Sequence, residues 1–265
     1  MPSSPFISPE ELFDTAATIL DTRWYLDGRD GHRSYLEGHL PGSVFIDLEA
    51  AATGSIDPRE GRHPLPPVST FLESMARLGV RFDRPVVLAD DQLGSVAARL
   101  WWMLDACGFD ARLLDGGVRA AEASCTQECT LPEADRAPAV AGWPALGTGT
   151  LRERQGVELL DARAAERYRG IIEPVDRTPG HIPGARSVPW TSLFEGGRLK
   201  SPTELHGLLA PREGRQAVAY CGSGVTACLL VAAGRAAGIE IELYAPSYSG
   251  WSSDPANPIC TDECG

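Results

Sequence analysis

Short apolar runs, each followed by a segment suited to a helix, recur along the chain. Residues 217–220 (AVAY) predict a buried strand, and the small apolar residues at 227–237 predict the helix after it. In the same way, a run that begins at 86–89 (VVLA) precedes a helical segment at 97–107. One more short apolar run follows each helix, at 111–114 and at 239–244. This alternation is typical of an α/β fold, in which helices flank a parallel sheet.

The same motifs occur twice, in the same order. Leu-Asp-x-Arg stands at 20–23 and again at 160–163. Gly-His-x-Pro-Gly also occurs twice, with His39 in the first copy and His181 in the second. A repeat of this length indicates a duplicated domain rather than a solenoid. Because the two histidines recur in matching turns, we expect both to bond the backbone rather than to act in catalysis.

The segment between the two copies lacks any periodic pattern. Residues 130–143 are rich in Pro and Ala, a composition typical of a linker. We therefore expect an N-terminal α/β domain over 1–129, a linker over 130–147 and a C-terminal α/β domain over 148–265.

The composition limits the partners that we expect. The chain has 265 residues and a formal charge of −12, which argues against nucleic acid or an anionic membrane surface as a partner. No apolar run approaches the roughly 20 residues needed to span a bilayer. The first residues lack the basic and apolar regions of a secretory signal. We therefore expect a cytoplasmic protein with neither a nucleic-acid nor a membrane partner.

The seven cysteines are an odd number in a chain too long to need disulfides, which suits a reducing compartment. Cys125 and Cys129 share their spacing with Cys260 and Cys264. Such thiols could bind zinc or respond to oxidation. The interpretation that we favour is a set of exposed loop and tail thiols, whereas we expect Cys107 and Cys228 to be buried.

The candidate site is the loop at 221–227 (CGSGVTA), between a predicted strand and a predicted helix. Cys221 then lies where unpaired backbone N–H groups and the positive end of the helix dipole favour an anion. A cysteine so placed loses its proton more easily than a free one, and the thiolate is the reactive form. The loop therefore predicts a sulfur nucleophile.

The rest of this loop suits an anionic product on the sulfur. Backbone N–H groups from Gly222, Gly224, Val225 and Thr226 could surround a terminal sulfur and spread its charge. The two glycines allow the positive φ that such a turn needs. The first copy has Asp90 or Asp91 in place of the cysteine, so that copy cannot carry out thiolate chemistry.

These motifs, which together cover nearly the whole chain, resemble the tandem-domain rhodanese family of sulfurtransferases. The resemblance implies two rhodanese-like domains, of which only the second is catalytic, and an active cysteine that cycles through a persulfide. The loop CGSGVTA looks like the version found in 3-mercaptopyruvate sulfurtransferases. Thiosulfate-preferring members carry Arg and Lys where this chain has Gly222 and Ser223.

The resemblance also implies roles for residues outside the loop. His63 and Glu49, both in the first domain, match a histidine and an acidic residue that reach the catalytic loop, where Ser223 would relay protons to His63. Arg167 and Arg177 match arginines that bind the donor carboxylate. Without the resemblance, we would interpret His63 as a solvated loop residue and Glu49 as a surface charge.

The predicted function is transfer of sulfane sulfur from 3-mercaptopyruvate, giving pyruvate, to cyanide or to a thiol acceptor such as thioredoxin. This chemistry requires no metal and no organic cofactor. One alternative is a thiosulfate sulfurtransferase. Another is a non-catalytic module that binds a persulfide or senses redox state.

Two other enzyme classes share parts of the loop pattern. Residues 222–227 fit the G-x-G-x-x-A pattern of dinucleotide-binding domains, with Glu240 and Glu242 further on. That pattern normally precedes several more strands, and only about 40 residues follow it here. A cysteine phosphatase needs an arginine to close the loop, where this chain has Ala227. We therefore expect neither activity.

Overall fold

The computed structural model describes residues 4–121 and 124–261. The chain divides into two compact units. The first comprises Met1–Thr53, Pro66–Trp143 and Gly197–Leu199. The second comprises Gly54–Leu65, Pro144–Gly196 and Lys200–Gly265.

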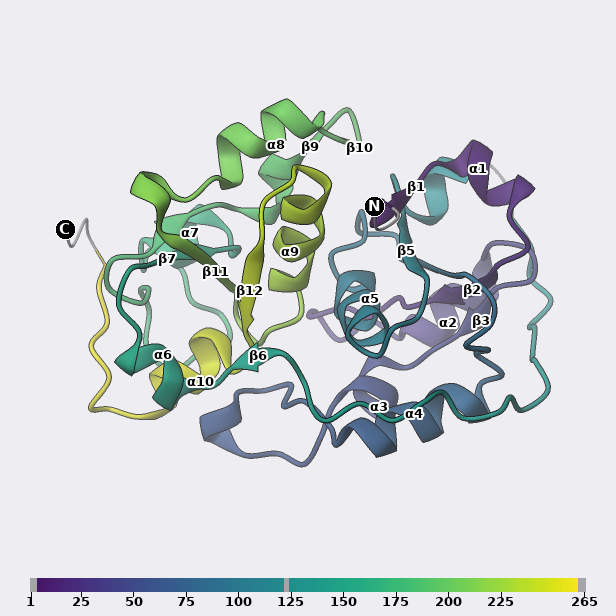
Figure 1. Ribbon diagram of the computed structural model, residues 1–265, viewed down its shortest axis with the longest axis horizontal. Coiled ribbons are helices and arrows are strands. Elements are labelled where there is room, and N and C mark those ends of the chain that lie inside the picture. The colour runs from purple at the N-terminus through teal and green to yellow at the C-terminus, as the bar shows by residue number, and fades with distance from the viewer. Residues whose placement is uncertain (1–3, 122–123, 262–265) are drawn as a thin grey trace. The chain divides into compact units, whose positions relative to one another are not determined.

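The first unit contains a five-stranded parallel sheet with the order β1-β5-β4-β2-β3. Its strands are β1 (Phe6–Ile7), β2 (Thr18–Asp21), β3 (Val44–Phe45), β4 (Val86–Ala89) and β5 (Ala111–Leu114). Its helices are α1 (Pro9–Asp14), α2 (Gly31–Glu37), α3 (Leu48–Ala52), α4 (Val68–Arg77) and α5 (Ala97–Ala106), with a 3₁₀ turn, η2 (Val118–Ala121). Figure 1 shows α5 alongside β5, and α3 next to α4.

The second unit repeats this topology in a sheet with the order β6-β12-β11-β7-β8, also parallel. Its sheet strands are β6 (Ala145–Leu146), β7 (Val157–Asp161), β8 (Arg186–Ser187), β11 (Gln216–Tyr220) and β12 (Ile241–Tyr244). Its helices are α6 (Thr148–Glu153), α7 (Ala165–Tyr168), α8 (Pro202–Leu209), α9 (Ala227–Ala236) and α10 (Ser247–Ser253). The short elements are η1 (Pro58–Glu60), η3 (Trp190–Leu193), β9 (Phe194–Glu195) and η4 (Arg212–Gly214), and β10 (Arg198–Leu199) falls in the first unit.

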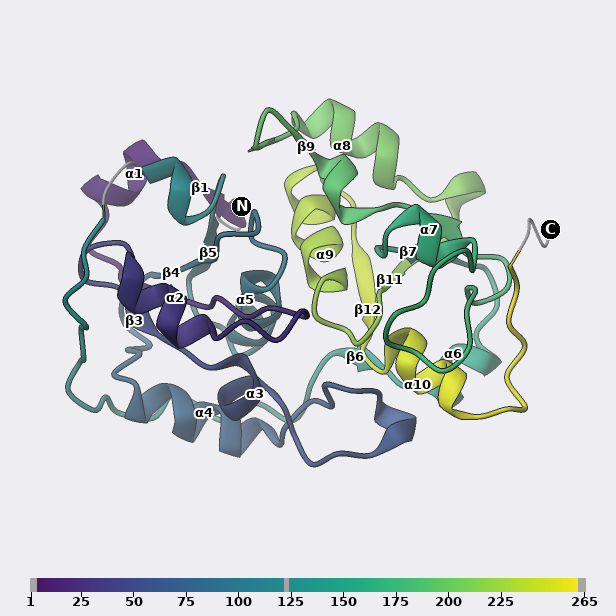
Figure 2. The same ribbon diagram turned by 180° about the vertical axis from the view of Figure 1, so that it is seen from behind.

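The central strand and its helix explain the apolar runs in the sequence. All four residues at 217–220 are fully buried in β11, because a parallel strand with helices on both faces has no solvent side. Helix α9 packs along β11 and β12 and against α8 (Figures 1 and 2). Its residues 227–234 are accordingly buried on every side. The strand and the helix that the sequence predicts here are confirmed.

Helix ends follow the capping chemistry of the sequence. Ser201 caps α8 in a capping box with Glu204, and Pro202 occupies the first turn. Ser8 and Glu11 form the same box at α1. These reciprocal hydrogen bonds satisfy backbone N–H groups that a helix start leaves without partners.

Three stretches group differently from the division made on sequence, and one of them is Gly197–Leu199, which belongs with the first unit. Residues 54–65, assigned above to the first domain, belong with the second unit. Within the segment assigned to the linker, Ala145–Leu146 form β6 and pair with β12. The described residues 130–144 form neither helix nor strand. Among the described residues, no helix is long and apolar enough to cross a membrane.

Candidate active site

The loop that holds Cys221 is fixed by the start of α10. Cys221, the first residue of the loop, follows β11 directly, and its amide donates a hydrogen bond to Ser247 Oγ (3.1 Å). The carbonyl of Cys221 accepts a hydrogen bond from the Tyr248 amide (3.0 Å), and that of Gly222 accepts one from the Ser249 amide (2.9 Å). These bonds hold the backbone on both sides of the sulfur, so Cys221 occupies a fixed position at the carboxyl end of the strand.

The loop then turns into α9 with its amides at the helix start. Gly224 has a φ of +78°, a conformation that favours glycine. The first N–H groups of an α-helix have no intrahelical acceptor, and they carry the positive end of the helix dipole. Cys221 is 3% exposed. The loop therefore places the buried Cys221 just before the N-terminal end of α9.

The first unit shows what such a loop does with an anion. Asp90 follows β4 and is fully buried. Its Oδ1 accepts hydrogen bonds from the amides of Gln92 and Gly94 (both 2.7 Å), and its Oδ2 from those of Val96 and Ala97 (both 2.9 Å). Burial raises the pKa of this carboxyl, and the four amide hydrogen bonds oppose that effect. The loop before α5 thus encloses a carboxylate with backbone N–H groups.

Strand register shows that Asp90, not Asp91, is the counterpart of Cys221. In the first sheet Asp21 pairs with Ala89, the residue before Asp90. In the second sheet the matching aspartate, Asp161, pairs with Tyr220, the residue before Cys221. The two alternatives left open by the sequence are therefore resolved. The cysteine stands where the other copy holds an enclosed anion.

His63 lies directly beside this loop. Its Nδ1 is 2.7 Å from Ser223 Oγ, and both residues are 7% exposed. From composition alone a solvated histidine was expected, so the burial of His63 corrects that interpretation. A histidine in contact with a hydroxyl can move a proton through it.

Close backbone packing carries His63 to its position. The segment 54–65 is closed by a hydrogen bond from the Gly54 amide to the Pro64 carbonyl (2.8 Å). Gly61, with a φ of +83°, approaches α10 so closely that a Cβ atom there would lie 2.5 Å from the Pro246 carbonyl oxygen. The next amide, of Arg62, donates to Ser249 Oγ (3.1 Å). The segment therefore packs on the same helix that fixes Cys221.

Arg167 and Arg62 both face the second residue of the loop. A Cβ atom on Gly222 would lie 2.9 Å from Arg62 Nη2 and 3.5 Å from Arg167 Nη1. The other nitrogens of Arg167 donate to Glu173 (Nε–Oε2 3.1 Å, Nη2–Oε1 2.6 Å) and to Asp176 (Nη2–Oδ2 3.0 Å). Arg62 donates to the second oxygen of Asp176 through Nη1. Two guanidinium groups therefore flank the loop, and Asp176 bridges them.

Sequence reasoning named Arg167 and Arg177 but not Arg62, which the structure places beside the loop. Arg177 is exposed, and the residue before it, Asp176, is the one that contacts the two arginines. The binding role of Arg177 stays a prediction. Arg62 directly precedes His63, which is the signal that could have found it. Its partner Asp176 lies 114 residues away, a pairing that no local pattern reveals.

Glu49 lies in the first unit, in α3, and is exposed. Its Oε1 accepts a hydrogen bond from Trp24 Nε1 (3.1 Å). His63 belongs to the second unit, although the resemblance implied the first. The orienting contact between Glu49 and His63 stays a prediction.

The two histidines of the repeated turns have a structural role, as expected. His39 Nδ1 is 2.7 Å from the Tyr35 carbonyl oxygen, and the ring stacks on Tyr35 at 3.8 Å. His181 Nδ1 is 2.7 Å from the Tyr168 carbonyl oxygen, with a stacking distance of 3.7 Å. Both rings are therefore held by the same contacts in the two copies.

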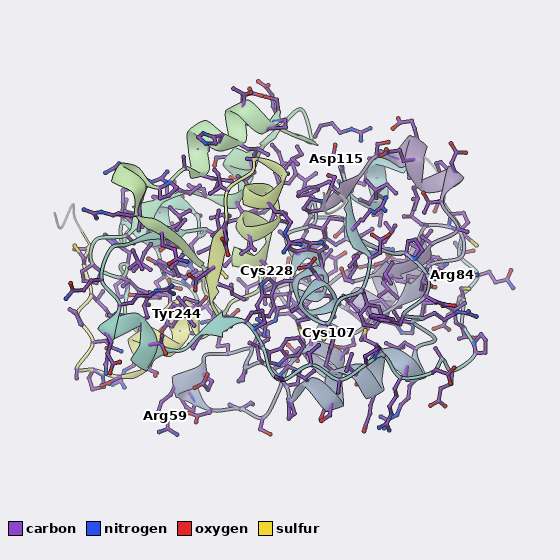
Figure 3. All side chains as sticks on the ribbon, viewed as in Figure 1. Arg59, Arg84, Cys107, Asp115, Cys228 and Tyr244 are labelled. Atoms are coloured by element: carbon purple, nitrogen blue, oxygen red, sulfur yellow. The ribbon has the colours of Figure 1, made fainter. Side chains whose placement is uncertain are left out.

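Two of the remaining thiols are buried, one just after a helix and one within a helix. Cys107, after the last residue of α5, and Cys228, in the first turn of α9, are both buried, as predicted (Figure 3). Burial raises the pKa of Cys107 to about 11. Cys228 donates to the Gly224 carbonyl (3.3 Å). Both thiols therefore serve packing rather than chemistry.

The cysteines with matching spacing differ from the expectation. Cys125 and Cys129 are free thiols of intermediate exposure. Cys260 is buried and disulfide-bonded, so the prediction of an exposed tail thiol is wrong for it. Its backbone pairs with His181, which holds it inside the fold. Cys264 lies outside the described residues.

Known proteins are similar to this chain. A family model described as "Rhodanese-like domain" matches residues 10–124 and 149–254. "Putative thiosulfate sulfurtransferase SseB" of Mycobacterium tuberculosis is 42% identical over 255 residues, covering 91% of this chain and 90% of that protein. "Probable 3-mercaptopyruvate sulfurtransferase" of Pseudomonas aeruginosa is 39% identical over 262 residues, covering 92% of each chain.

A solved structure of a related protein has a similar fold. The 3-mercaptopyruvate sulfurtransferase SseA of Escherichia coli superposes with a TM-score of 0.79 at 29% identity, covering 91% of this chain and 98% of that one. Three findings lead to one conclusion: the two parallel sheets flanked by helices, the double match to one family model and the similarity over 91–92% of the chain. The chain belongs to the rhodanese family and is a sulfurtransferase with two rhodanese-like domains.

Proposed function

We propose that this sulfurtransferase takes sulfane sulfur from 3-mercaptopyruvate and passes it to a thiol through a persulfide on Cys221. The observation that carries the proposal is the position of Cys221 at the start of α9. Its counterpart Asp90 has a terminal anion that accepts four backbone hydrogen bonds. The same turn around Cys221 would stabilise the anion of an outer sulfur in the same way.

In the first step, the Cys221 thiolate attacks the sulfur of 3-mercaptopyruvate. An S–S bond forms, the C–S bond of the donor breaks, and its electron pair passes to carbon as the enolate of pyruvate. The sulfur is thereby oxidised to the sulfane level while the carbon is reduced, so no external oxidant or reductant enters. The enolate then takes one proton to give pyruvate.

Ser223 and His63 are suited to carry that proton. The 2.7 Å contact between Ser223 Oγ and His63 Nδ1 allows a proton from the donor thiol to be held and returned to the enolate carbon. Arg167 would bind the donor carboxylate beside Gly222, since its Nη1 faces that residue. Glu49 and Arg177 are proposed as further site residues on the resemblance alone.

The donor assignment depends on the small neutral residues at the loop. Gly222 and Ser223 leave no cation on the loop itself for the second charge of thiosulfate. Relatives are named for both donors, 3-mercaptopyruvate in Pseudomonas aeruginosa and in human, thiosulfate in Mycobacterium tuberculosis. Thiosulfate is therefore the second candidate donor for this chain.

In the second step an acceptor takes the outer sulfur. A thiolate attacks that sulfur, a new S–S bond forms on the acceptor, and Cys221 leaves as the thiolate. Thioredoxin is the protein acceptor that we propose, and cyanide serves as a small acceptor in an assay. A cytoplasmic location stays a prediction from the sequence.

Mass spectrometry of the protein after exposure to 3-mercaptopyruvate tests the proposal. We expect an adduct of one sulfur on Cys221, together with release of pyruvate. Cys221→Ser should lose both, whereas the control Cys129→Ser, at a free thiol of the first unit, should keep both. Pyruvate release by Cys221→Ser would contradict the mechanism. A persulfide that forms without turnover would instead indicate a sulfur-binding module.

A further inference from the structure

Four charged side chains stand beside the catalytic loop, and their charges cancel. Arg62 and Arg167 supply two positive charges at Gly222, while Asp176 and Glu173 supply two negative ones. Asp176 is the bridge, with its Oδ1 bonded to Arg62 and its Oδ2 to Arg167. Its side chain is only 4% exposed.

The free nitrogens of the pair point toward the loop. The bonds to Asp176 use Arg62 Nη1 and Arg167 Nη2. Arg62 Nη2 and Arg167 Nη1 are the atoms closest to the position of a Cβ on Gly222. A sulfur donor that is an anion would thus meet two guanidinium groups at the loop. Their positive charge is already neutralised by Asp176 and Glu173.

We propose that Asp176 is a specificity-determining residue that favours singly charged over doubly charged sulfur donors. The proposal rests on the proposed function and names a feature of the same site. A 2-oxo acid with a neutral thiol carries one negative charge, and thiosulfate carries two. With Asp176 ionised the four side chains sum to zero, so the second charge of thiosulfate gains no net attraction.

The magnitude follows from Coulomb's law. Removing one negative charge about 6 Å from a bound unit charge changes affinity by about three- to tenfold, for effective dielectric constants of about 80 to 40. The interaction energy of a dianion changes by twice the amount calculated for a monoanion, because the energy is proportional to the charge. Neutralising Asp176 should therefore raise the efficiency of thiosulfate relative to 3-mercaptopyruvate by about three- to tenfold.

The protonation of Asp176 gives a second readout. Burial raises the pKa of Asp176, although Arg62 and Arg167 oppose this. The charged or titratable groups that face it are Arg62, Arg163, Arg167, Glu173 and Tyr248. As the pH falls, Asp176 should gain its proton earlier than an ordinary aspartate. The wild-type preference should then shift toward thiosulfate.

The experiment compares Asp176→Asn with the wild type. The measured quantity is the ratio of kcat/KM for thiosulfate to kcat/KM for 3-mercaptopyruvate, with cyanide as acceptor, from about pH 8 to about pH 5. We expect the ratio to rise about three- to tenfold in Asp176→Asn at the upper pH. It should also rise with falling pH more steeply in the wild type than in the variant.

Two controls separate charge selection from a structural effect. Glu166→Gln, in α7, changes the net charge by the same amount. Because Glu166 is 52% exposed and pairs with Arg169, the donor ratio of this variant should equal that of the wild type. Asp176→Glu keeps the charge and should restore the wild-type ratio. If Asp176→Asn fails to fold, Asp176→Ser, which also removes the charge, takes its place in the same comparison.

The outcomes also separate this inference from the proposed function. An unchanged ratio in Asp176→Asn, or an equal loss with both donors, overturns the role of Asp176 while leaving the persulfide mechanism intact. A wild-type profile no steeper than that of the variant also counts against it. Absence of a Cys221 persulfide with either donor would instead overturn the proposed function.

Discussion

Asp90→Asn is the substitution that most directly tests the idea of an anion enclosed by amides. The change keeps the size of the side chain and one of its two oxygens. With Oδ1 retained, the bonds from the amides of Gln92 and Gly94 survive. At Oδ2, an NH₂ group would instead face the amides of Val96 and Ala97. Hydrogen-bond donors would then face each other at a site with no exposure to water.

The cost follows from those two lost bonds. A buried donor left without an acceptor costs about 1–3 kcal/mol. Two such donors cost about 2–6 kcal/mol in the free energy of unfolding, well above the roughly 1 kcal/mol of a typical substitution. Asparagine carries no charge, so the cost of burying a charged carboxylate is removed. This gain offsets part of the loss, and we expect a destabilisation in the lower half of that range.

Urea unfolding at neutral pH, followed by circular dichroism and tryptophan fluorescence, measures the change. The matched control is Asp91→Asn, at the next residue, whose side chain is 13% exposed and accepts one hydrogen bond from the Tyr25 hydroxyl (2.8 Å). We expect the control to cost about 1 kcal/mol. Equal costs for the two variants would refute the reasoning, and would remove the support that Asp90 gives to an anionic sulfur at Cys221.

Two further substitutions probe the second unit. Ser223→Ala breaks the contact with His63 and should slow pyruvate release from 3-mercaptopyruvate by about 10²-fold or more. Thiosulfate turnover, whose leaving group needs no proton, should fall far less in steady-state kinetics, and an equal fall would contradict the relay. For Glu173, burial acts to raise the pKa, but hydrogen bonds from Arg167 and from backbone amides lower it overall. Its stabilising effect is therefore present above the unfolded pKa and lost as the pH falls through the folded one. Glu173→Gln should be less stable than the wild type at neutral pH, and urea unfolding in acid should show the difference shrinking.

The local features of the fold could be predicted because each has a local cause. The run at 217–220 is apolar because both faces of β11 are covered, and the small residues after 227 suit a helix packed on every side. The repeated Gly-His-x-Pro-Gly turns signalled the duplication that the two strand orders confirm. The placement of Cys221 between strand and helix followed from these elements alone.

The parts that the sequence did not predict depend on contacts between distant residues. Asp176 and Arg62 meet across 114 positions. His63 reaches Ser223 across 160, a contact that the family resemblance implied but no local pattern predicts. The burial of His63 depends on Gly61, whose lack of a side chain lets the segment approach α10. Neither composition nor periodicity encodes such a contact. The choice between Asp90 and Asp91 likewise needed the register of β2 and β4.

The duplication also explains why one turn can serve structure in one copy and chemistry in the other. An aspartate oxygen and the outer sulfur of a cysteine persulfide are each three bonds from their Cα, so both can reach the same backbone N–H groups. In the first unit the anion is part of the side chain, and the amides around Asp90 are permanently occupied. With cysteine at that position, the side chain is one atom shorter, and we propose that an added sulfur would accept hydrogen bonds from the loop amides as Asp90 does. Because the added atom can leave again, the same hydrogen bonds that stabilise the fold around Asp90 would stabilise a reaction intermediate around Cys221.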